Sequence, residues 1–327
     1  MKLLGKYISS DTSIKSVLAN NSGEIVEVSL LNNKPYDVIC VPTFHYCNLG
    51  CKMCHLTYPG LKKCQTKVTI DELLEAITKT VSDDNKRITN KNKLLVSFMG
   101  VGEPLLNFEL IKELYLKEDY LKKLGYDDVT YSLSTMMPND NLKHLTNEIN
   151  DLNLPLKIHF SLHSSIDQKR KELIPSSTLR IDDAYKLLEN YQKTIVNNPV
   201  IMNNFHQFHN NDNVIETHYT LIDDINDSAF ELSYLIYYLD RYKSSVKFIE
   251  FNEKKDMQAS SKVDKWVNII KENIFVDVKI YNPPGKDIGS SCGCFTKHFY
   301  LGEVETEEEY EEFLKWDEKY KVKKLNL

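Results

Sequence analysis

Short apolar runs alternate with longer mixed segments along most of this chain. Six runs of seven to nine residues, rich in Val, Ile, Leu and Phe, predict strands at residues 36–44, 94–100, 129–135, 156–162, 214–222 and 246–252. The segments between them predict helices that begin near residues 69, 107, 141, 181, 228 and 262. Regular alternation of strands and helices is typical of a parallel sheet covered by helices. We therefore expect an α/β fold, a partial and open (βα)6 barrel.

Three stretches depart from this alternation. Residues 13–31 hold two β-prone runs around an Asn-Asn-Ser-Gly turn, which predicts a short N-terminal β-hairpin. Residues 197–213 are rich in Asn and His, and we expect a surface loop there. Residues 303–318 hold nine acidic residues and one lysine, which favours a surface helix over an interaction tail. The predicted parts are the hairpin extension 1–35, the barrel 36–294 and an acidic C-terminal extension 295–327.

Composition narrows the classes of protein that remain. No apolar run in the 327 residues approaches the length of a membrane span, and the first residues lack the apolar core of a secretory signal. We therefore expect a cytoplasmic protein with reduced thiols. The net charge of −6 argues weakly against a nucleic-acid partner, but residues 303–318 alone carry −8 (one lysine minus nine acids), so the remainder sums to +2. A basic groove on that remainder is compatible with these numbers.

The cysteines supply the first chemical signal. Cys47, Cys51 and Cys54 follow the spacing C-x-x-x-C-x-x-C, so one short loop can place three thiolates around a single iron–sulfur cube. Protein cysteines normally fill all four iron positions of such a cube, so three ligands leave one iron open to another molecule. Zinc is the alternative, but structural zinc usually takes two separated pairs of ligands. The spacing therefore favours a [4Fe-4S] cluster.

Polar residues follow several predicted strands. Chemistry in barrels lies at the carboxyl ends of the strands, and glycines there let the backbone approach a ligand closely. A carboxylate can accept hydrogen bonds from an ammonium group, and hydroxyl, imidazole and amide groups suit ribose and carboxylate binding. The residues at these ends are Gly102, Glu103, Ser134, Ser161, His163 and Asn252.

Together these motifs resemble the class A radical-SAM methyltransferases, the RlmN/Cfr family that methylates adenine carbons C2 or C8 in RNA. The resemblance rests on Cys40, seven residues before the cysteine triplet, and on a series of motifs in the same order. These motifs are Phe-Met-Gly-Val-Gly-Glu-Pro-Leu at 98–105, Leu-Ser-Thr at 133–135, Ser-Leu-His at 161–163, Asp167 to Pro175, Asp223 to Ser228, Phe251-Asn252 and Asp287 to Gly293.

The resemblance implies roles for individual residues. Cys47, Cys51 and Cys54 would bind the [4Fe-4S] cluster, and the polar residues at the strand ends would line the site for S-adenosylmethionine (SAM). Cys292 would take a methyl group from one SAM, and a second SAM would yield the radical that activates this S-methyl group for addition to the base. Cys40 would remove the ring proton and release the product by forming a disulfide with Cys292. The implied partners are rRNA or tRNA and an electron donor such as flavodoxin or ferredoxin, and we expect a monomer.

The chain also departs from the family pattern. The thirty-nine residues before Cys40 are too few for the usual helical accessory domain, Met136 and Met137 follow the Leu-Ser-Thr motif, and Cys294 is an additional thiol. A second hypothesis uses Cys40, Cys64, Cys292 and Cys294 as ligands of an auxiliary cluster, in an enzyme that modifies a peptide or a small molecule. A third is an inactive homologue that only binds RNA or protein. The sequence leaves all three open.

Overall fold

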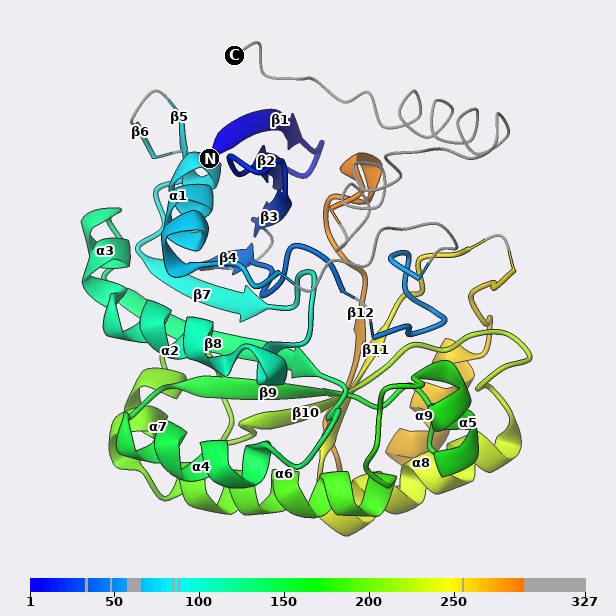
Figure 1. The fold of residues 1–327 in the computed structure, drawn as a ribbon. Helices are drawn as coiled ribbons and strands as arrows, with labels where there is room; N and C mark the ends of the chain where they lie inside the picture. The colour runs from blue at the N-terminus through cyan, green and yellow to red at the C-terminus, as the bar shows by residue number, and fades with distance from the viewer. Residues whose placement is uncertain are drawn as a thin grey trace. The chain divides into compact units, whose positions relative to one another are not determined.

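The computed structural model describes residues 1–32, 35–47, 49–57, 66–83, 86–87, 89–254 and 256–290 (Figure 1). The chain divides into two compact units. The first comprises Met1–Asn48, His55–Tyr131 and Pro283–Leu327, and the second comprises Leu49–Cys54 and Ser132–Asn282. The predicted acidic extension 295–327, together with Cys64, Cys292 and Cys294, lies outside the described residues.

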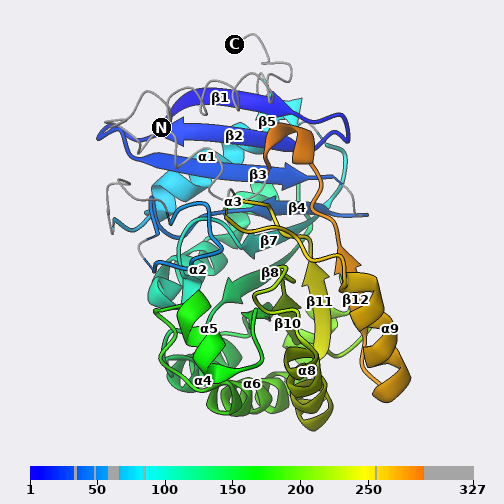
Figure 2. The ribbon, with the colours of Figure 1, turned by 90° about the vertical axis from the view of Figure 1, so that its right-hand side faces the viewer.

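An antiparallel sheet begins the first unit and becomes parallel at its last pair of strands (Figure 2). Its strands, in spatial order, are β1 (Lys2–Ile8), β2 (Ile14–Ala19), β3 (Ile25–Leu31), β4 (Asp37–Cys40) and β7 (Lys93–Phe98), with β8 (Asp128–Thr135) next to β7. Every residue of β2 and β3 is buried, including the polar side chains of Lys15, Glu27 and Ser29. The predicted hairpin is confirmed, and β1 extends it.

Helices cover this sheet and place its loops. Helix α1 (Ile70–Val81) packs on β2 and β3. It begins with a capping box, in which Thr69 and Glu72 satisfy each other's backbone N–H groups. The other elements of the first unit are β5 (Ser82–Asp83), β6 (Lys86–Arg87), η1 (Pro104–Leu106), α2 (Phe108–Leu116), α3 (Glu118–Lys123) and η2 (Lys286–Ile288).

The second unit is a parallel βα array. Strands β9 (Leu156–Ser161), β10 (Ile215–Tyr219), β11 (Ser245–Ile249) and β12 (Val278–Tyr281) pair in that order, all parallel. Figure 1 shows the long helices of this unit along one face of β9 and β10. The helices are α4 (Leu142–Asp151), α5 (Asp167–Leu173), α6 (Ile181–Val196), α7 (Pro199–Phe205), α8 (Ala229–Tyr242) and α9 (Val263–Asn273).

The two faces of β9 and β10 differ in chemistry. Phe160 and Thr217 meet Tyr185 of α6, by ring contact and by a 2.8 Å hydrogen bond respectively. The opposite face carries His159 directly beside Glu216 in the strand register. One face is therefore the packed core, and the other presents ionisable groups.

The predicted strands and helices are present, with one correction and several additional elements. The expected loop at 197–213 is wrong over its first half, because Asn198 caps helix α7 and Ile201, Met202 and Phe205 are buried. Strand β1, helices α3 and α5 and strand β12 are additional elements that the sequence pattern did not predict. The predicted domain boundaries stay a prediction. Among the described residues, no helix combines the length and apolar character needed to cross a membrane.

Candidate functional site

The cysteine loop turns sharply after Cys47. Gly50 has a φ of +72°, a left-handed conformation that favours glycine, and the Cys54 N–H donates to the Cys51 carbonyl at 2.9 Å. All three cysteines of the motif are half-buried. Cys51 and Cys54 belong to the second unit, and Cys47 belongs to the first. A tight loop with three partly accessible thiols is a donor set that suits an iron–sulfur cluster.

Apolar side chains seat this loop on the second unit. Leu49, Cys51 and Met53 pack against a cluster of buried residues, and the Cys51 Sγ lies 3.7 Å from the Met136 Sδ. The Lys254 ammonium also donates to the carbonyls of Lys52 and Cys54, at 2.7 and 3.3 Å. The buried cluster consists of Met136, Leu173, Ile174, Ile222 and Phe251.

The carboxyl ends of β8 and β9 carry three predicted SAM-site residues. The Ser134 Oγ is buried and has no hydrogen-bond partner among the described residues. Ser161 ends β9, and His163 follows with a φ of +54°. An unpartnered hydroxyl at a strand end is what a site for a polar ligand would leave in a structure without that ligand.

His163 is fixed as a neutral hydrogen-bond donor. Its Nδ1 accepts from the Thr220 N–H at 3.1 Å, so the proton of the neutral ring is on Nε2. Burial lowers the pKa of His163 to about 3, and the nearby His218 and Arg170 add to this effect. Asn226 holds the same turn by donating to the His163 carbonyl at 2.6 Å. His163 can therefore offer one N–H to a ligand at neutral pH.

Asn252, the last predicted residue of this group, is exposed just beyond β11. Its neighbour Phe251 belongs to the buried cluster that seats the cysteine loop. The second unit thus gathers Cys51 and the residues that follow β8, β10 and β11 in one apolar cluster.

Gly102 and Glu103 lie in the first unit, after β7. Gly102 has a φ of +109°, and a Cβ there would come within 2.6 Å of Thr43 Oγ1 and of the Phe44 ring. Glu103 is only 3% exposed, and its Oε1 accepts from the Leu105 N–H at 3.1 Å. The close approach at Gly102 and a buried carboxylate beside it fit the predicted binding of an ammonium group.

Cys40 lies in a row of polar side chains that crosses four strands. The register pairs Lys15 of β2 with Ser29 of β3, Ser29 with Cys40 of β4, and Cys40 with Ser97 of β7. The carbonyl of Ser290 accepts from Ser29 Oγ at 3.0 Å and from Lys15 Nζ at 3.4 Å. The chain two residues before Cys292 is therefore held over the row that contains Cys40.

This row sets the ionisation of Cys40. Burial raises the pKa of its thiol to about 11, and the Lys15 ammonium and a hydrogen bond with Ser97 limit that rise. Lys15 itself is paired with Glu27 at 2.5 Å, and both side chains are 2% exposed. Cys40 is therefore a protonated thiol at neutral pH, beside a buried ion pair.

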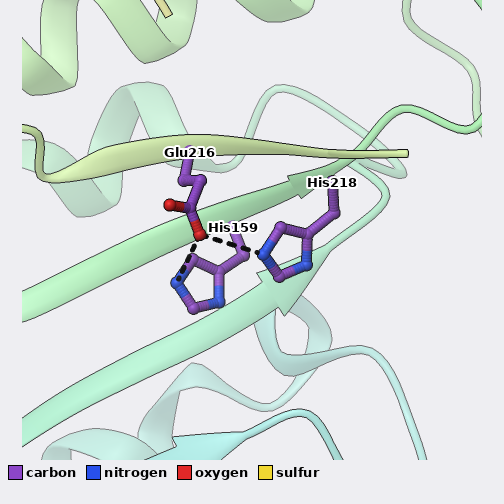
Figure 3. A group of neighbouring side chains, drawn as sticks. All are labelled: His159, Glu216 and His218. Atoms are coloured by element: carbon purple, nitrogen blue, oxygen red, sulfur yellow. Dashed lines mark hydrogen bonds and ion pairs between the residues drawn. The ribbon is translucent and has the colours of Figure 1, made fainter. Parts of the chain in front are cut away.

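A second cluster of ionisable groups lies on the polar face of β9 and β10 (Figure 3). His159, Glu216 and His218 place three ligand atoms within 4.8 Å of one another. The Glu216 Oε1 is 3.4 Å from His218 Nε2 and 3.9 Å from His159 Nε2. This combination of side chains also occurs at zinc and iron sites.

The surrounding charges decide against a cation in this cluster. Glu216 forms ion pairs with Lys247, Lys279 and Lys157, the last two at 3.3 and 3.8 Å. A divalent ion about 5 Å from an ammonium would be repelled by about 7 kcal/mol at an effective dielectric constant of about 20, and three ammonium groups are present. Burial alone would raise the pKa of Glu216, but His218 and the lysines hold it far below its usual value. The cluster is an ion-pair network around one buried carboxylate.

Sequence reasoning missed this network and the buried Arg170. In β9, Lys157 and His159 alternate with apolar residues, and this period of two predicts one polar and one apolar face of the strand. Arg170 had no such signal, because it lies in a charged segment that reads as solvent-exposed.

Comparison with known proteins shows what this chain is similar to. No protein-family model matches it. The probable dual-specificity RNA methyltransferase RlmN of Clostridium botulinum strain Loch Maree is 29% identical over 300 residues, covering 89% of this chain and 79% of the relative. The corresponding protein of Alkaliphilus metalliredigens is 28% identical over 295 residues, covering 88% of this chain and 75% of the relative.

One solved structure agrees on the fold. The crystal structure of a radical SAM methyltransferase from Sphaerobacter thermophilus matches with a TM-score of 0.68 at 19% identity, over 89% of this chain and 80% of that one. This structural match confirms the predicted α/β fold with the partial barrel of radical SAM proteins. By sequence and by fold, the chain is a distant homologue of the RlmN-like radical SAM methyltransferases.

Proposed function

We propose that this protein methylates an sp2 carbon of adenine in rRNA or tRNA, with Cys292 as the methyl carrier and Cys40 as the residue that releases the product. Radical SAM methyltransferase homology supports the reaction class, and the family implies a [4Fe-4S] cluster and SAM. The names of the relatives, RNA methyltransferases, support the substrate class.

The position of Ser290 is the observation that carries this proposal. Its carbonyl is bound by Ser29 and Lys15, in the row that contains Cys40. Asp287 adds a second attachment, because it accepts from the Ser10 N–H at 2.9 Å. Cys292 follows Ser290 by two residues, so a short span of chain separates it from the row of Cys40.

The cofactor assignments follow from the residues described above. In this proposal the cluster and SAM, when bound, supply the methyl group and the radical that activates it. The three loop cysteines hold the cluster. The groups that bind SAM are Gly102, Glu103, Ser134, Ser161, His163 and Asn252.

The two remaining thiols handle the substrate carbon. Cys292 holds the methyl group as a thioether, and its carbon becomes bonded to the adenine ring. Cys40 takes the ring proton, and the electron left on the adduct returns to the oxidised form of the electron donor. Cys40 then gives up its proton, and its thiolate attacks the Cys292 sulfur, so that the S–CH2 bond breaks as the S–S bond forms and the released carbon takes a proton. An external thiol reduces the disulfide for the next turnover.

Mass spectrometry of the protein purified without oxygen, with its cluster, tests the methyl carrier. We expect a mass increase of one methyl group on Cys292, absent in Cys292→Ala and retained in Cys294→Ala, the matched control two residues away. With RNA and SAM, Cys40→Ala should accumulate a covalent protein–RNA adduct, because the step that breaks the S–CH2 bond is lost. A protein that binds SAM but never carries methyl on Cys292 would contradict the proposal.

Iron content separates this function from the auxiliary-cluster hypothesis. One [4Fe-4S] cluster corresponds to about four irons per chain, and two clusters to about eight. If Cys40→Ala and Cys292→Ala each lost about half of the iron, both residues would be cluster ligands. We expect both variants to keep the wild-type iron content.

A further inference from the structure

Helix α5 lies within the motif Asp167 to Pro175, to which the proposed function assigns no role. Most of the helix is charged and faces solvent, but Arg170 is 2% exposed. A guanidinium group loses its hydration on burial, so every N–H needs an acceptor. The acceptors of Arg170 therefore show what the helix is holding.

Arg170 binds the carboxyl ends of two strands. Its Nε donates to the Leu162 carbonyl at 3.1 Å, and one terminal nitrogen donates to the carbonyls of Met136 and Ser161, at 2.6 and 3.3 Å. The other terminal nitrogen donates to Ser177 Oγ. These carbonyls belong to the segments that carry Ser134, Ser161 and His163. A planar group with donors on several edges can bridge such acceptors, and an ammonium cannot.

The end of the same helix binds the cysteine loop. The Leu173 carbonyl accepts from the Lys52 N–H at 2.9 Å, and Ser176 Oγ donates to the Leu49 carbonyl at 2.5 Å. Leu173 and Ile174 are also part of the apolar cluster that seats the loop. One segment of eleven residues, 167–177, thus contacts both the cysteine loop and the ends of β8 and β9.

We propose that Arg170 is a positioning residue that sets the spacing between the cysteine loop and the strand ends that bind SAM. This inference rests on the cofactor part of the proposed function, and it is independent of Cys292 and of the RNA substrate. A ligand that binds both the loop's cluster and the strand ends needs their separation fixed before it arrives, because its affinity falls when the protein must reorganise to bind.

The charge of Arg170 has a second effect on the same strand end. It adds to burial in lowering the pKa of His163, so the imidazole stays neutral with its proton on Nε2. A variant that keeps the charge but loses the planar group separates these two effects.

Arg170→Lys keeps the charge and loses the three-way bridge, and Lys171→Gln, an exposed neighbour on the same helix, is the matched control. We would measure three quantities on the anaerobically reconstituted proteins: iron per chain, the Kd for SAM by equilibrium dialysis, and the change in the cluster's electron paramagnetic resonance spectrum when SAM is added. In Arg170→Lys we expect wild-type iron content, a Kd for SAM raised about tenfold or more, which corresponds to about 1.4 kcal/mol, and a weaker spectral change. Lys171→Gln should match the wild type in all three.

Wild-type affinity and an unchanged spectral response in Arg170→Lys would overturn the inference. If Arg170→Lys does not fold, Ser176→Ala replaces it as the test, because this variant removes one hydroxyl contact to the cysteine loop. A raised Kd for SAM at wild-type iron content supports the inference. An unchanged Kd for SAM overturns it. A wild type whose spectrum ignores SAM would overturn both the cofactor assignment and this inference. A wild type that responds to SAM but never methylates Cys292 would overturn only the methyl-carrier mechanism.

Discussion

The behaviour of single residues here depends on neighbours from other strands. Cys40 has Lys15, Ser29 and Ser97 in its cross-strand row. Burial in this row raises the pKa of its thiol to about 11. Only the thiolate attacks sulfur. The role proposed for Cys40 therefore requires that the pKa of its thiol falls during the reaction, through a change in the water, substrate or Lys15 ammonium around it.

The alkylation rate of Cys40 in the cluster-free protein tests this environment. Well below its pKa, the thiolate fraction of a cysteine rises about tenfold per pH unit. We expect the rate constant for iodoacetamide at Cys40, followed by peptide mapping, to rise throughout pH 7 to 9 without a plateau. A rate whose rise already bends toward a plateau between pH 8 and 9 would show that the thiol has an ordinary pKa.

His218 gives the folded state a dependence on acid. Burial lowers its pKa to about 4, from an ordinary value of 6.5. Below pH 6.5 this histidine is protonated in the unfolded chain but stays neutral in the folded protein. Its contribution to the free energy of unfolding is therefore fully present above about pH 6.5 and is lost progressively toward pH 4.

We therefore expect His218 to reduce the free energy of unfolding by about 2 kcal/mol between pH 6.5 and pH 5. Urea unfolding at these two pH values measures the difference. His218→Gln should reduce the difference, and His144→Gln, an exposed histidine on α4, should leave it unchanged. An identical acid dependence in His218→Gln would exclude this histidine as its source.

At the level of elements, the segment before Cys292 owes its position to the first strands of the chain. Gly285 N–H donates to Asp11 at 2.7 Å, and Asp287 accepts from the Ser10 N–H at 2.9 Å. The turn between β1 and β2 thus supports the segment that precedes Cys292, as well as linking two strands of the sheet.

Asp287→Asn should weaken this support. An amide can still accept from the Ser10 N–H, but it lacks the charge that strengthens such a hydrogen bond, typically by about twofold. We expect the rate of Cys292 methylation to fall several-fold, while iron content and SAM binding stay at wild-type levels. Asp11→Asn should act in the same direction. Loss of the cluster in either variant would contradict a purely local effect.

For the whole molecule, residues predicted for the site occur in each of the two compact units. Cys40, Gly102 and Glu103 belong to the first, and Cys51 and His163 belong to the second. Within the second unit, the cysteine loop is held by the Leu173 carbonyl, the Ser176 hydroxyl and the apolar cluster. A bound cluster would add covalent ligation to these contacts.

Hydrogen exchange with and without the cluster measures this contribution. Metal binding stabilises the conformation that presents the ligands, so amides of residues 49–54 should exchange at least tenfold more slowly in the loaded protein. Amides of α6 and α8, which pack on the far side of the second unit's sheet, should not change. Cys51→Ser should lack the effect, and equal exchange in both forms of the wild type would contradict it.

Sequence periodicity predicted most elements because each long strand or helix has its own repeating pattern of apolar residues. It failed for α5, α7 and β12, which have seven, seven and four residues. Helix α7 was missed because its buried face of Ile201, Met202 and Phe205 lies among Asn and His residues typical of loops.

By itself, the sequence determined the βα alternation, the cysteine triplet and the polar strand ends, since each is encoded in residues that are neighbours along the chain. Only the tertiary structure decided which distant residues meet: the row from Lys15 to Ser97 that contains Cys40, the three lysines around Glu216, and the bridge from Arg170 to Met136 and Ser161. Strand register and the burial of charge create these contacts, and both depend on which elements pack together, which no local pattern specifies.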